Sequence, residues 1–221
     1  MKIEIWSDVV CPWCYIGKRR LSRALGEFEH ADEVTVAWRS FQLNPDTPPG
    51  TAVPTAKYLA QRFGPQASQM TGRVAELARE EGLDFDFDAA LTVNTLDAHR
   101  VLHLAADLGV GDAAKERLLR AHFTEGADLS DPQTLVRLAG EAGVDTGRAR
   151  EVLAGTEYAD AVRADIELAQ AFGATGVPFF VIDRKYGLSG AQPAETFLQA
   201  LRTAYADETE HRAAADPVAP R

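Results

Sequence analysis

The sequence predicts an α/β protein with a β-α-β unit at the start, a long helical stretch in the middle, and a hairpin and a helix at the end. Three observations indicate this order. Apolar residues alternate on either side of an early helical stripe, no strand pattern occurs from about residue 55 to 172, and a short apolar run typical of a buried strand begins at residue 179. Of the 221 residues, 46% are hydrophobic and 25% are charged, so the chain can form a substantial core.

The β-α-β unit is predicted over residues 2–41. Lys2–Ser7 alternates, with both isoleucines on one face, and is typical of a short strand. At Cys11 and Pro12 the pattern changes to a helical period, and the apolar stripe of this helix contains Leu21, Ala24, Leu25 and Phe28. Residues 34–41 alternate again and predict a second strand.

Turn-forming residues and a charged C-terminal segment divide the rest of the chain into a helical stretch, a hairpin, a closing helix and a tail. A turn-rich segment, 44–50, precedes the helical stretch, whose helices are amphipathic. Phe179–Ile182 and Tyr186–Ser189 predict a hairpin, and a closing helix follows. From Asp207 onward the chain is charged and rich in alanine, which predicts a frayed tail.

The charge balance excludes some classes of partner. The chain has 23 Lys and Arg against 33 Asp and Glu, a formal net charge of −10. Nonspecific binding to nucleic acid or to an anionic membrane needs clustered basic charge, so neither partner is expected. No apolar window reaches the length of a membrane span, and no apolar signal-like region follows Met1. We therefore expect a cytoplasmic protein.

The chemistry is indicated by Cys11-Pro12-Trp13-Cys14, which contains both cysteines of the chain. A disulfide here would close a loop too short to constrain the unfolded chain, so a catalytic dithiol is the better interpretation. A cysteine at a helix N-terminus faces unpaired N–H groups, which favour a thiolate and predict a lowered pKa for Cys11. Pro12 suits the first helical turn, and Cys14 is expected nearer the helix interior.

Two other interpretations of the cysteines compete with a catalytic dithiol. They would be unrelated core thiols, or they would form half of a zinc site completed by His99 and His103, which are four residues apart on one predicted helix. The chain has no second cysteine pair, and the strand–motif–helix context favours redox chemistry. No metal is therefore expected.

The segment 7–18 resembles the active-site segment of the FrnE-like branch of the DsbA-type oxidoreductases. Further segments that resemble this branch are 41–45, 94–95, 98–100, 176–180 and 189–193. The resemblance covers about residues 2–200. It implies an α/β thioredoxin-like fold with a large all-helical domain inserted after the first β-α-β unit. The thioredoxin-like domain would then comprise 1–50 and 160–206, with the helical insertion at 51–159 and a flexible tail at 207–221.

The resemblance also implies that Val177-Pro178 is a cis-proline loop facing the dithiol. In such loops the residue before proline offers its backbone to an extended substrate or to glutathione. The alternative is a plain proline at the entry to a strand.

Four further residues are candidates for the site. Asp8 either tunes proton transfer or caps a turn, and Trp13 is expected to be exposed to a partner. Asn94 and His99 are expected to line the cleft; the alternatives are a helix cap and a surface histidine.

The expected function is thiol–disulfide exchange with protein or small-thiol substrates. Cys11 attacks a partner disulfide, and Cys14 resolves the mixed disulfide. No tightly bound cofactor is expected beyond the redox-active Cys11–Cys14 pair. Glutathione is a candidate co-substrate, and an external reductant or oxidant recycles the pair.

Two alternative functions remain open. The first is a glutathione-dependent isomerase or transferase of the 2-hydroxychromene-2-carboxylate isomerase or kappa type, relatives that typically carry serine where this chain has Cys11. The second is a noncatalytic disulfide-binding module.

Overall fold

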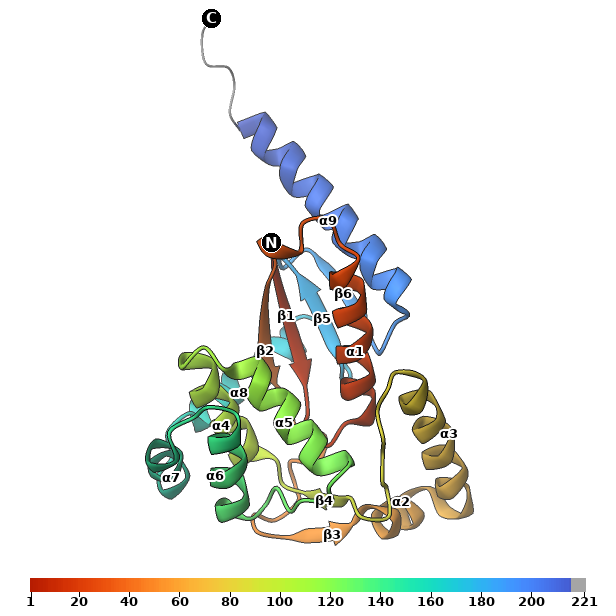
Figure 1. Ribbon diagram of the computed structural model, residues 1–221, viewed down its shortest axis with the longest axis vertical. Helices are drawn as coiled ribbons and strands as arrows, with labels where there is room; N and C mark the ends of the chain where they lie inside the picture. The colour runs from red at the N-terminus through yellow and green to blue at the C-terminus, as the bar shows by residue number, and fades with distance from the viewer. Residues whose placement is uncertain (216–221) are drawn as a thin grey trace, which may run out of the picture.

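The computed structural model describes residues 1–215, and within them a four-stranded sheet has the order β2-β1-β5-β6 (Figure 1). β1 (Lys2–Ser7) is parallel to β2 (Thr35–Ser40) and antiparallel to β5 (Phe179–Ile182), which pairs with β6 (Tyr186–Ser189). All four predicted strands are confirmed, the second being slightly shorter than expected.

Helices cover both faces of this sheet. α1 (Pro12–Gly26) and α9 (Ala194–Ala215) pack on one face with Ile3 and Ile5, as the alternation of β1 predicts. α8 (Ala159–Ala171) covers the other face, where Trp6 is fully buried. A 3-10 turn, Ala31–Glu33, joins α1 to β2. The sheet with its two helical layers forms the thioredoxin-like part of the fold.

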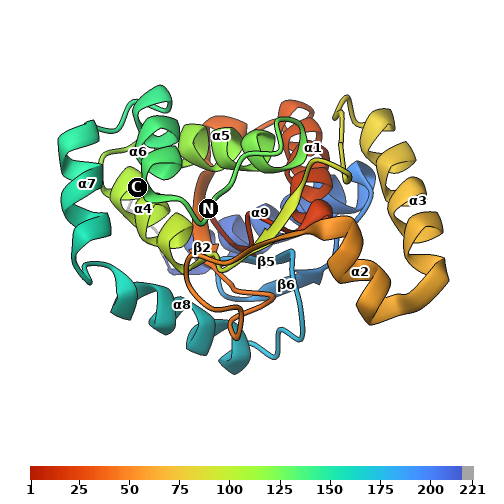
Figure 2. The same cartoon turned by 90° about the horizontal axis from the view of Figure 1, so that it is seen from below.

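The remaining elements form an insertion between β2 and α8. They are β3 (Ala52–Pro54), α2 (Thr55–Phe63), a 3-10 turn (Gly64–Gln66), α3 (Ala67–Glu80), β4 (Leu91–Val93), α4 (Leu96–Asp107), α5 (Gly111–Phe123), α6 (Pro132–Glu141) and α7 (Thr146–Ala154). Seen from below, α2 and α3 lie on one side of the molecule and α4, α6 and α7 on the other (Figure 2). α4 to α7 enclose an apolar core of their own. The domain boundaries at residues 50 and 159 stay predictions.

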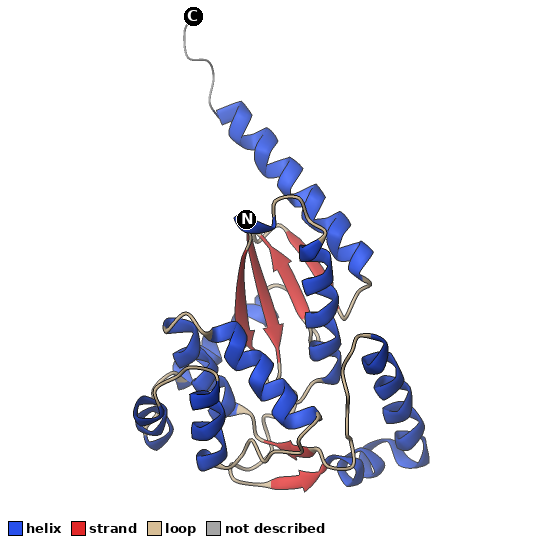
Figure 3. Cartoon of the chain, viewed as in Figure 1, coloured by secondary structure: helices blue, strands red, loops and turns tan. Residues whose placement is uncertain are grey.

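The insertion was expected to be all-helical, but it also contains two short strands. β3 and β4 form a two-stranded antiparallel ribbon, in which Ala52 faces Val93 and Pro54 faces Leu91 (Figure 3). Each strand has three residues, fewer than the four to eight over which alternation becomes recognisable. Because the strands are far apart in sequence, no hairpin signal marks them.

The frayed tail predicted from Asp207 is wrong as far as Ala215. α9 continues through this segment and projects beyond the sheet (Figure 1). Alanine and glutamate are strong helix formers, and Tyr186 of β6 donates a hydrogen bond to the Asp207 carboxylate. Residues 216–221 of the predicted tail lie outside the described residues.

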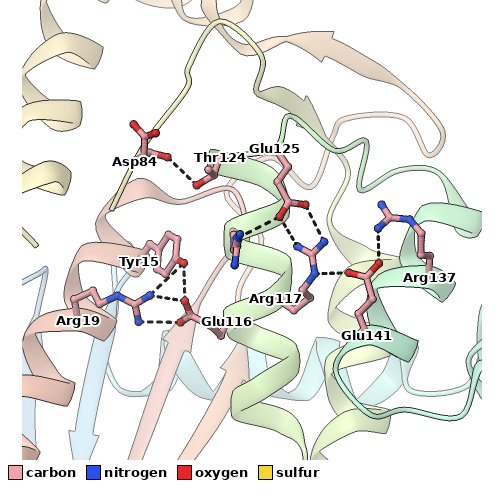
Figure 4. Close-up of polar contacts among 10 residues, drawn as sticks. Tyr15, Arg19, Asp84, Glu116, Arg117, Thr124, Glu125, Arg137 and Glu141 are labelled. Carbon is pink, nitrogen blue, oxygen red and sulfur yellow. Dashed lines mark hydrogen bonds and ion pairs between the residues drawn. The ribbon is translucent and has the colours of Figure 1, made fainter. Parts of the chain in front are cut away.

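Polar contacts join the insertion to α1 (Figure 4). The Tyr15 hydroxyl donates to Glu116 of α5 at 2.6 Å, and the Arg19 guanidinium forms two hydrogen bonds with the same carboxylate. The Tyr15 ring also packs with the Phe123 ring of α5, at 6.3 Å between ring centres. The helix that begins at the cysteines is therefore held on one side by α5.

Gly126, just after α5, is predicted to tolerate no side chain. Its φ is +62°, and a Cβ would lie 2.8 Å from the Ala89 Cβ and from the Ala89 carbonyl oxygen. Gly109 has a similar φ of +75° with open space around it. Gly109→Ala should therefore cost about 1 kcal/mol of unfolding free energy from backbone strain alone. Gly126→Ala should cost about 2 kcal/mol more, because overpacking is added. Urea unfolding measures both, and equal losses would show that the close approach is unimportant.

Candidate active site

The dithiol lies at the point where β1 passes into α1. Cys11 is the N-cap residue of α1, with extended backbone angles, and Pro12 occupies the first helical turn. The Cys11 N–H donates to the Asp8 carbonyl at 3.3 Å, and the Cys14 N–H donates to the Cys11 carbonyl at 3.1 Å. The predicted start of the helix at the cysteine pair is confirmed.

Both cysteines are free thiols and are buried. Cys11 retains 3% of its surface and Cys14 retains 1%. The Cys11 thiol lies 3.5 Å from the Val177 carbonyl oxygen, to which it donates. The Val177-Pro178 bond is cis, as the resemblance implied, and the loop faces the dithiol.

The ionisation of the pair differs from the sequence prediction, because the lowered pKa belongs to Cys14 and not to Cys11. Burial by itself raises the pKa of Cys14, but the hydrogen bond from Cys11 and the positive charge of Lys115 outweigh it. The hydrogen bond to Cys14, together with burial, raises the pKa of Cys11 well above its usual value. Burial and the neighbouring sulfur therefore oppose a negative charge on Cys11, whereas Lys115 favours one on Cys14.

Lys115 is the site residue that the sequence prediction missed. It comes from α5 and is fully buried, and its ammonium lies 3.4 Å from the Ser7 carbonyl oxygen. The ammonium also lies 5.5 Å from the centre of the Trp38 ring, within cation–π range. Burial lowers the pKa of Lys115 to about 8. The sequence contains one indication of this role. Lys115 precedes Leu118 by three residues and Leu119 by four, which places it on the apolar face of its helix.

Asp8 is completely buried and joins three segments of the chain. Its carboxylate accepts hydrogen bonds from the Val9 N–H at 2.8 Å, the Leu43 N–H at 2.8 Å and the His99 ring at 3.2 Å. Burial by itself raises the pKa of Asp8, but these partners outweigh it and hold the pKa below its ordinary value. Asp8 is therefore more than a local turn cap.

His99 is buried, so the surface-histidine alternative is wrong. Burial lowers its pKa, which makes it a neutral hydrogen-bond donor to Asp8 at neutral pH. His103 is the other histidine of the alternative zinc site. Its ring contacts the Ser40 hydroxyl and the Asp165 carboxylate, and not the cysteines.

Asn94 lies apart from the dithiol and holds a loop. Its side-chain amide donates to the Thr47 carbonyl at 2.7 Å, and its oxygen accepts from the Leu96 N–H at 2.9 Å. These contacts fix the turn-rich segment 44–50 to the start of α4. Trp13 is 39% exposed, as expected for a residue that meets a partner.

A pocket of about 240 Å³ opens beside Val10 and Pro12 and is lined mainly by residues of the insertion. Residues from α2, β4 and the end of α5 line it, among them Leu59, Thr92 and His122. His122 is buried, and within the described residues its Nδ1 has no hydrogen-bond partner. Burial lowers the pKa of His122 to about 4, so its ring is neutral at pH 7.

Within residues 1–215, no helix combines the length and the apolar character needed to cross a membrane.

The sheet, its helical layers and a CxxC pair beside a cis-proline loop define a thioredoxin-fold protein with an inserted domain. The model of the DSBA-like thioredoxin domain matches residues 2–202, and the chain belongs to this family.

Several relatives share nearly the whole chain. A crystal structure of a probable DsbA oxidoreductase from Streptomyces coelicolor is 44% identical, covers 93% of this chain and 90% of its own, and superposes with a TM-score of 0.89. The uncharacterized protein YwbO of Bacillus subtilis is 26% identical over 90% of this chain and 94% of its own length. The cytosolic disulfide reductase DsbM of Pseudomonas aeruginosa, solved with GSH, is 21% identical, covers 96% of this chain and all of its own, and has a TM-score of 0.62. This last likeness shows the shared fold.

Acid is predicted to destabilise the protein through His122. Its pKa is about 4 in the folded protein against 6.5 ordinarily, so the unfolded chain binds the extra proton between these values. Above pH 6.5 the neutral His122 does not reduce the free energy of unfolding. As the pH falls from 6.5 to 4, protonation of this residue in the unfolded chain lowers that free energy. In His122→Gln, the loss of unfolding free energy between pH 7 and pH 4 should be smaller by up to about 3 kcal/mol.

Urea unfolding at the two pH values measures this difference. His211→Gln, on the surface of α9, is the control, and an equal acid-induced loss in both variants would contradict the prediction.

Proposed function

We propose that the protein is a thiol–disulfide oxidoreductase, in which Cys11 attacks a partner disulfide and Cys14 resolves the mixed disulfide. The observation that carries this function is the pair of free thiols at the start of α1, with the Cys11 thiol 3.5 Å from the Val177 carbonyl oxygen. The family and the Streptomyces relative named as a probable DsbA oxidoreductase support the same chemistry.

The reaction begins with the charge on Cys14. Transfer of the Cys11 proton to Cys14 moves the negative charge to Cys11, the residue with slightly more exposed surface. The Cys11 thiolate attacks one sulfur of the partner disulfide and forms a new S–S bond. The partner's S–S bond breaks, and its leaving thiolate takes up the proton that Cys14 gives up.

Resolution follows within the pair. The Cys14 thiolate attacks the Cys11 sulfur, the mixed disulfide breaks, and the second partner thiolate leaves and takes a proton from water. Two electrons have then passed from the dithiol to the partner, and an external thiol must reduce Cys11–Cys14 again. Lys115 acts here as a positioning residue, because its positive charge favours the Cys14 thiolate.

Val177 is proposed to bind the backbone of the partner. Its carbonyl oxygen faces Cys11 just before β5, so an extended chain there can donate an N–H to it. Asp8 and His99 are proposed to hold the dithiol against the insertion, Trp13 to contact the partner, and Asn94 to order the neighbouring loop.

Glutathione is a proposed co-substrate. The DsbM structure was solved with GSH and is named a cytosolic disulfide reductase, which supports this choice and the predicted cytoplasmic location. A structure of 2-hydroxychromene-2-carboxylate isomerase has a TM-score of 0.63 at 15% identity, a likeness in fold alone. The alternative of a glutathione-dependent isomerase remains less favoured, because Cys11 stands where such relatives typically carry serine.

Replacing each cysteine in turn is predicted to separate their roles. Cys14→Ser should accumulate a mixed disulfide through Cys11 with glutathione or insulin, because no second sulfur displaces the partner. Cys11→Ser should accumulate none, and both variants should lose insulin reduction. Intact-protein mass spectrometry detects the adducts, and an adduct on Cys11→Ser alone would reverse the two roles.

Replacing Lys115 is predicted to make the dithiol harder to ionise. In Lys115→Gln, the pH midpoint of alkylation by iodoacetamide should rise by about one unit, since a nearby positive charge no longer favours the Cys14 thiolate.

Lys18→Gln is the matched control, because Lys18 also lies over the Trp38 ring but forms ion pairs with Asp112 and Glu116. Thermal unfolding verifies that both variants are folded. A midpoint that stays unchanged in Lys115→Gln would remove Lys115 from the site.

A further inference from the structure

We propose that Trp38 is a positioning residue for the dithiol, because its indole ring holds the buried Lys115 ammonium in place of a carboxylate. An aromatic ring stabilises a cation without cancelling its charge, so the charge of Lys115 stays available to the sulfurs. This inference rests on the proposed function and deepens it, because it adds a residue that acts on Cys14 only through Lys115.

The Lys115 ammonium is a buried charge without a counter-ion in direct contact. The residue is fully buried, and its Nζ donates to the Ser7 carbonyl oxygen at 3.4 Å, a long hydrogen bond. Among residues 1–215, no carboxylate oxygen lies within ion-pair distance of this nitrogen. A buried ammonium is costly unless other groups replace the water that it has lost, so a further stabilising contact is required.

Trp38 supplies that contact from β2. The Lys115 Nζ lies 5.5 Å from the centre of the Trp38 ring, within the range of a cation–π interaction. The face of an aromatic ring is negative, but the ring has no net charge. A carboxylate in the same place would pair with the ammonium and cancel most of its field at the dithiol, whereas the indole ring leaves that field in place.

Lys18 shows the contrasting arrangement at the same ring. Its Nζ lies 5.8 Å from the centre of the Trp38 ring, but it also lies 3.1 Å from a carboxylate oxygen of Asp112 and 3.1 Å from one of Glu116. Two carboxylates therefore neutralise Lys18. Of the two ammonium groups beside the ring, Lys115 is the one that favours the Cys14 thiolate.

The orientation of the ring is fixed by its own contacts. Trp38 lies opposite Ile5 in the register of β2 and β1 and packs against the apolar cluster beneath α1. Its indole N–H donates to the Asp112 carboxylate at 2.9 Å. Asp112 precedes Lys115 by three residues on α5, yet its oxygens bind the indole and Lys18. The acidic residue nearest on the helix is thus turned away from Lys115.

Several titratable groups face the Lys115 ammonium from the other elements around it. They are Cys11, Cys14 and Lys18 of α1, Asp8 of the preceding turn and His99 of α4. Burial is the largest influence and lowers the pKa of Lys115 to about 8, so the ammonium is mostly charged at pH 7. Loss of the ring would lower this pKa further and remove positive charge in the pH range where the thiols ionise.

The test measures the pH midpoint of alkylation of the dithiol by iodoacetamide. In Trp38→Leu the midpoint should rise by about half a unit or more, and by no more than in Lys115→Gln, because the lysine remains but is less often charged. Trp38→Phe keeps an aromatic face and should restore most of the difference. An unchanged midpoint in Trp38→Leu would overturn the proposal.

A double-mutant cycle separates this role from packing. Adding Trp38→Leu to Lys115→Gln should raise the midpoint no further, because the charge on which Trp38 acts is already absent. An equal rise in the presence and in the absence of Lys115 would show that Trp38 acts through the packing of β2 against α1. That result would also overturn the proposal.

Tyr186→Leu is the matched control. Tyr186 packs against the same apolar cluster as Trp38, and its hydroxyl donates to the Asp207 carboxylate, so this variant also loses a ring and a hydrogen bond to an aspartate. Its alkylation midpoint should equal that of the wild type. A rise as large as in Trp38→Leu would show that the loss of any such ring is sufficient, and the proposal would fail.

A second route keeps the test valid if circular dichroism shows that Trp38→Leu is unfolded. The tryptophans of the protein are then replaced during expression by fluorinated tryptophan, which nearly preserves their shape but weakens the negative face of the ring. The midpoint should rise when Lys115 is present and stay unchanged when the same labelling is made in Lys115→Gln. Equal shifts in the two proteins would overturn the proposal.

The proposed function is tested separately with the wild-type protein. Its failure to reduce both insulin and glutathione disulfide would overturn the proposed function. The alkylation midpoints do not depend on a disulfide substrate, so they would still decide whether Trp38 acts on the sulfurs through Lys115.

Discussion

The buried carboxylate of Asp8 is the constraint on which the site depends. It accepts hydrogen bonds from the turn before Cys11, from the segment after β2 and from His99 of α4, so three separate parts of the chain meet at one charge. An isolated buried carboxylate would be very costly, and it persists because all of these donors face it. The position of the dithiol relative to the insertion follows from this junction.

The insertion therefore contributes to the candidate active site. α4 contributes His99, and α5 contributes Lys115, a buried cation close enough to the sulfurs to favour the Cys14 thiolate. α5 also holds α1 through Glu116, which binds both Tyr15 and Arg19. The thioredoxin-like sheet presents the sulfurs, and the inserted helices supply buried charge and most of the neighbouring pocket.

The sequence allowed the prediction of features that arise from short-range pattern. The strands β1 and β5 show their alternation or apolar run directly, and Pro12 marks the first turn of α1. The ribbon of β3 and β4 was not predicted, because each strand is short and its partner lies about forty residues away in the sequence. α9 was predicted too short, because composition suggested fraying where helix formers and the Asp207 contact continue the helix.

The sequence by itself determined the dithiol, its place at a helix start, and the family resemblance from which the cis-proline loop was inferred. Only the tertiary structure placed a buried cation near the dithiol, because the Lys115 ammonium donates to the Ser7 carbonyl, 108 residues away along the chain. It also decided that His99, 91 residues from Asp8, is buried against that carboxylate. The physical reason is that burial and charge act through space: a residue's neighbours along the chain set its local conformation, but its neighbours in the fold set its electrostatics.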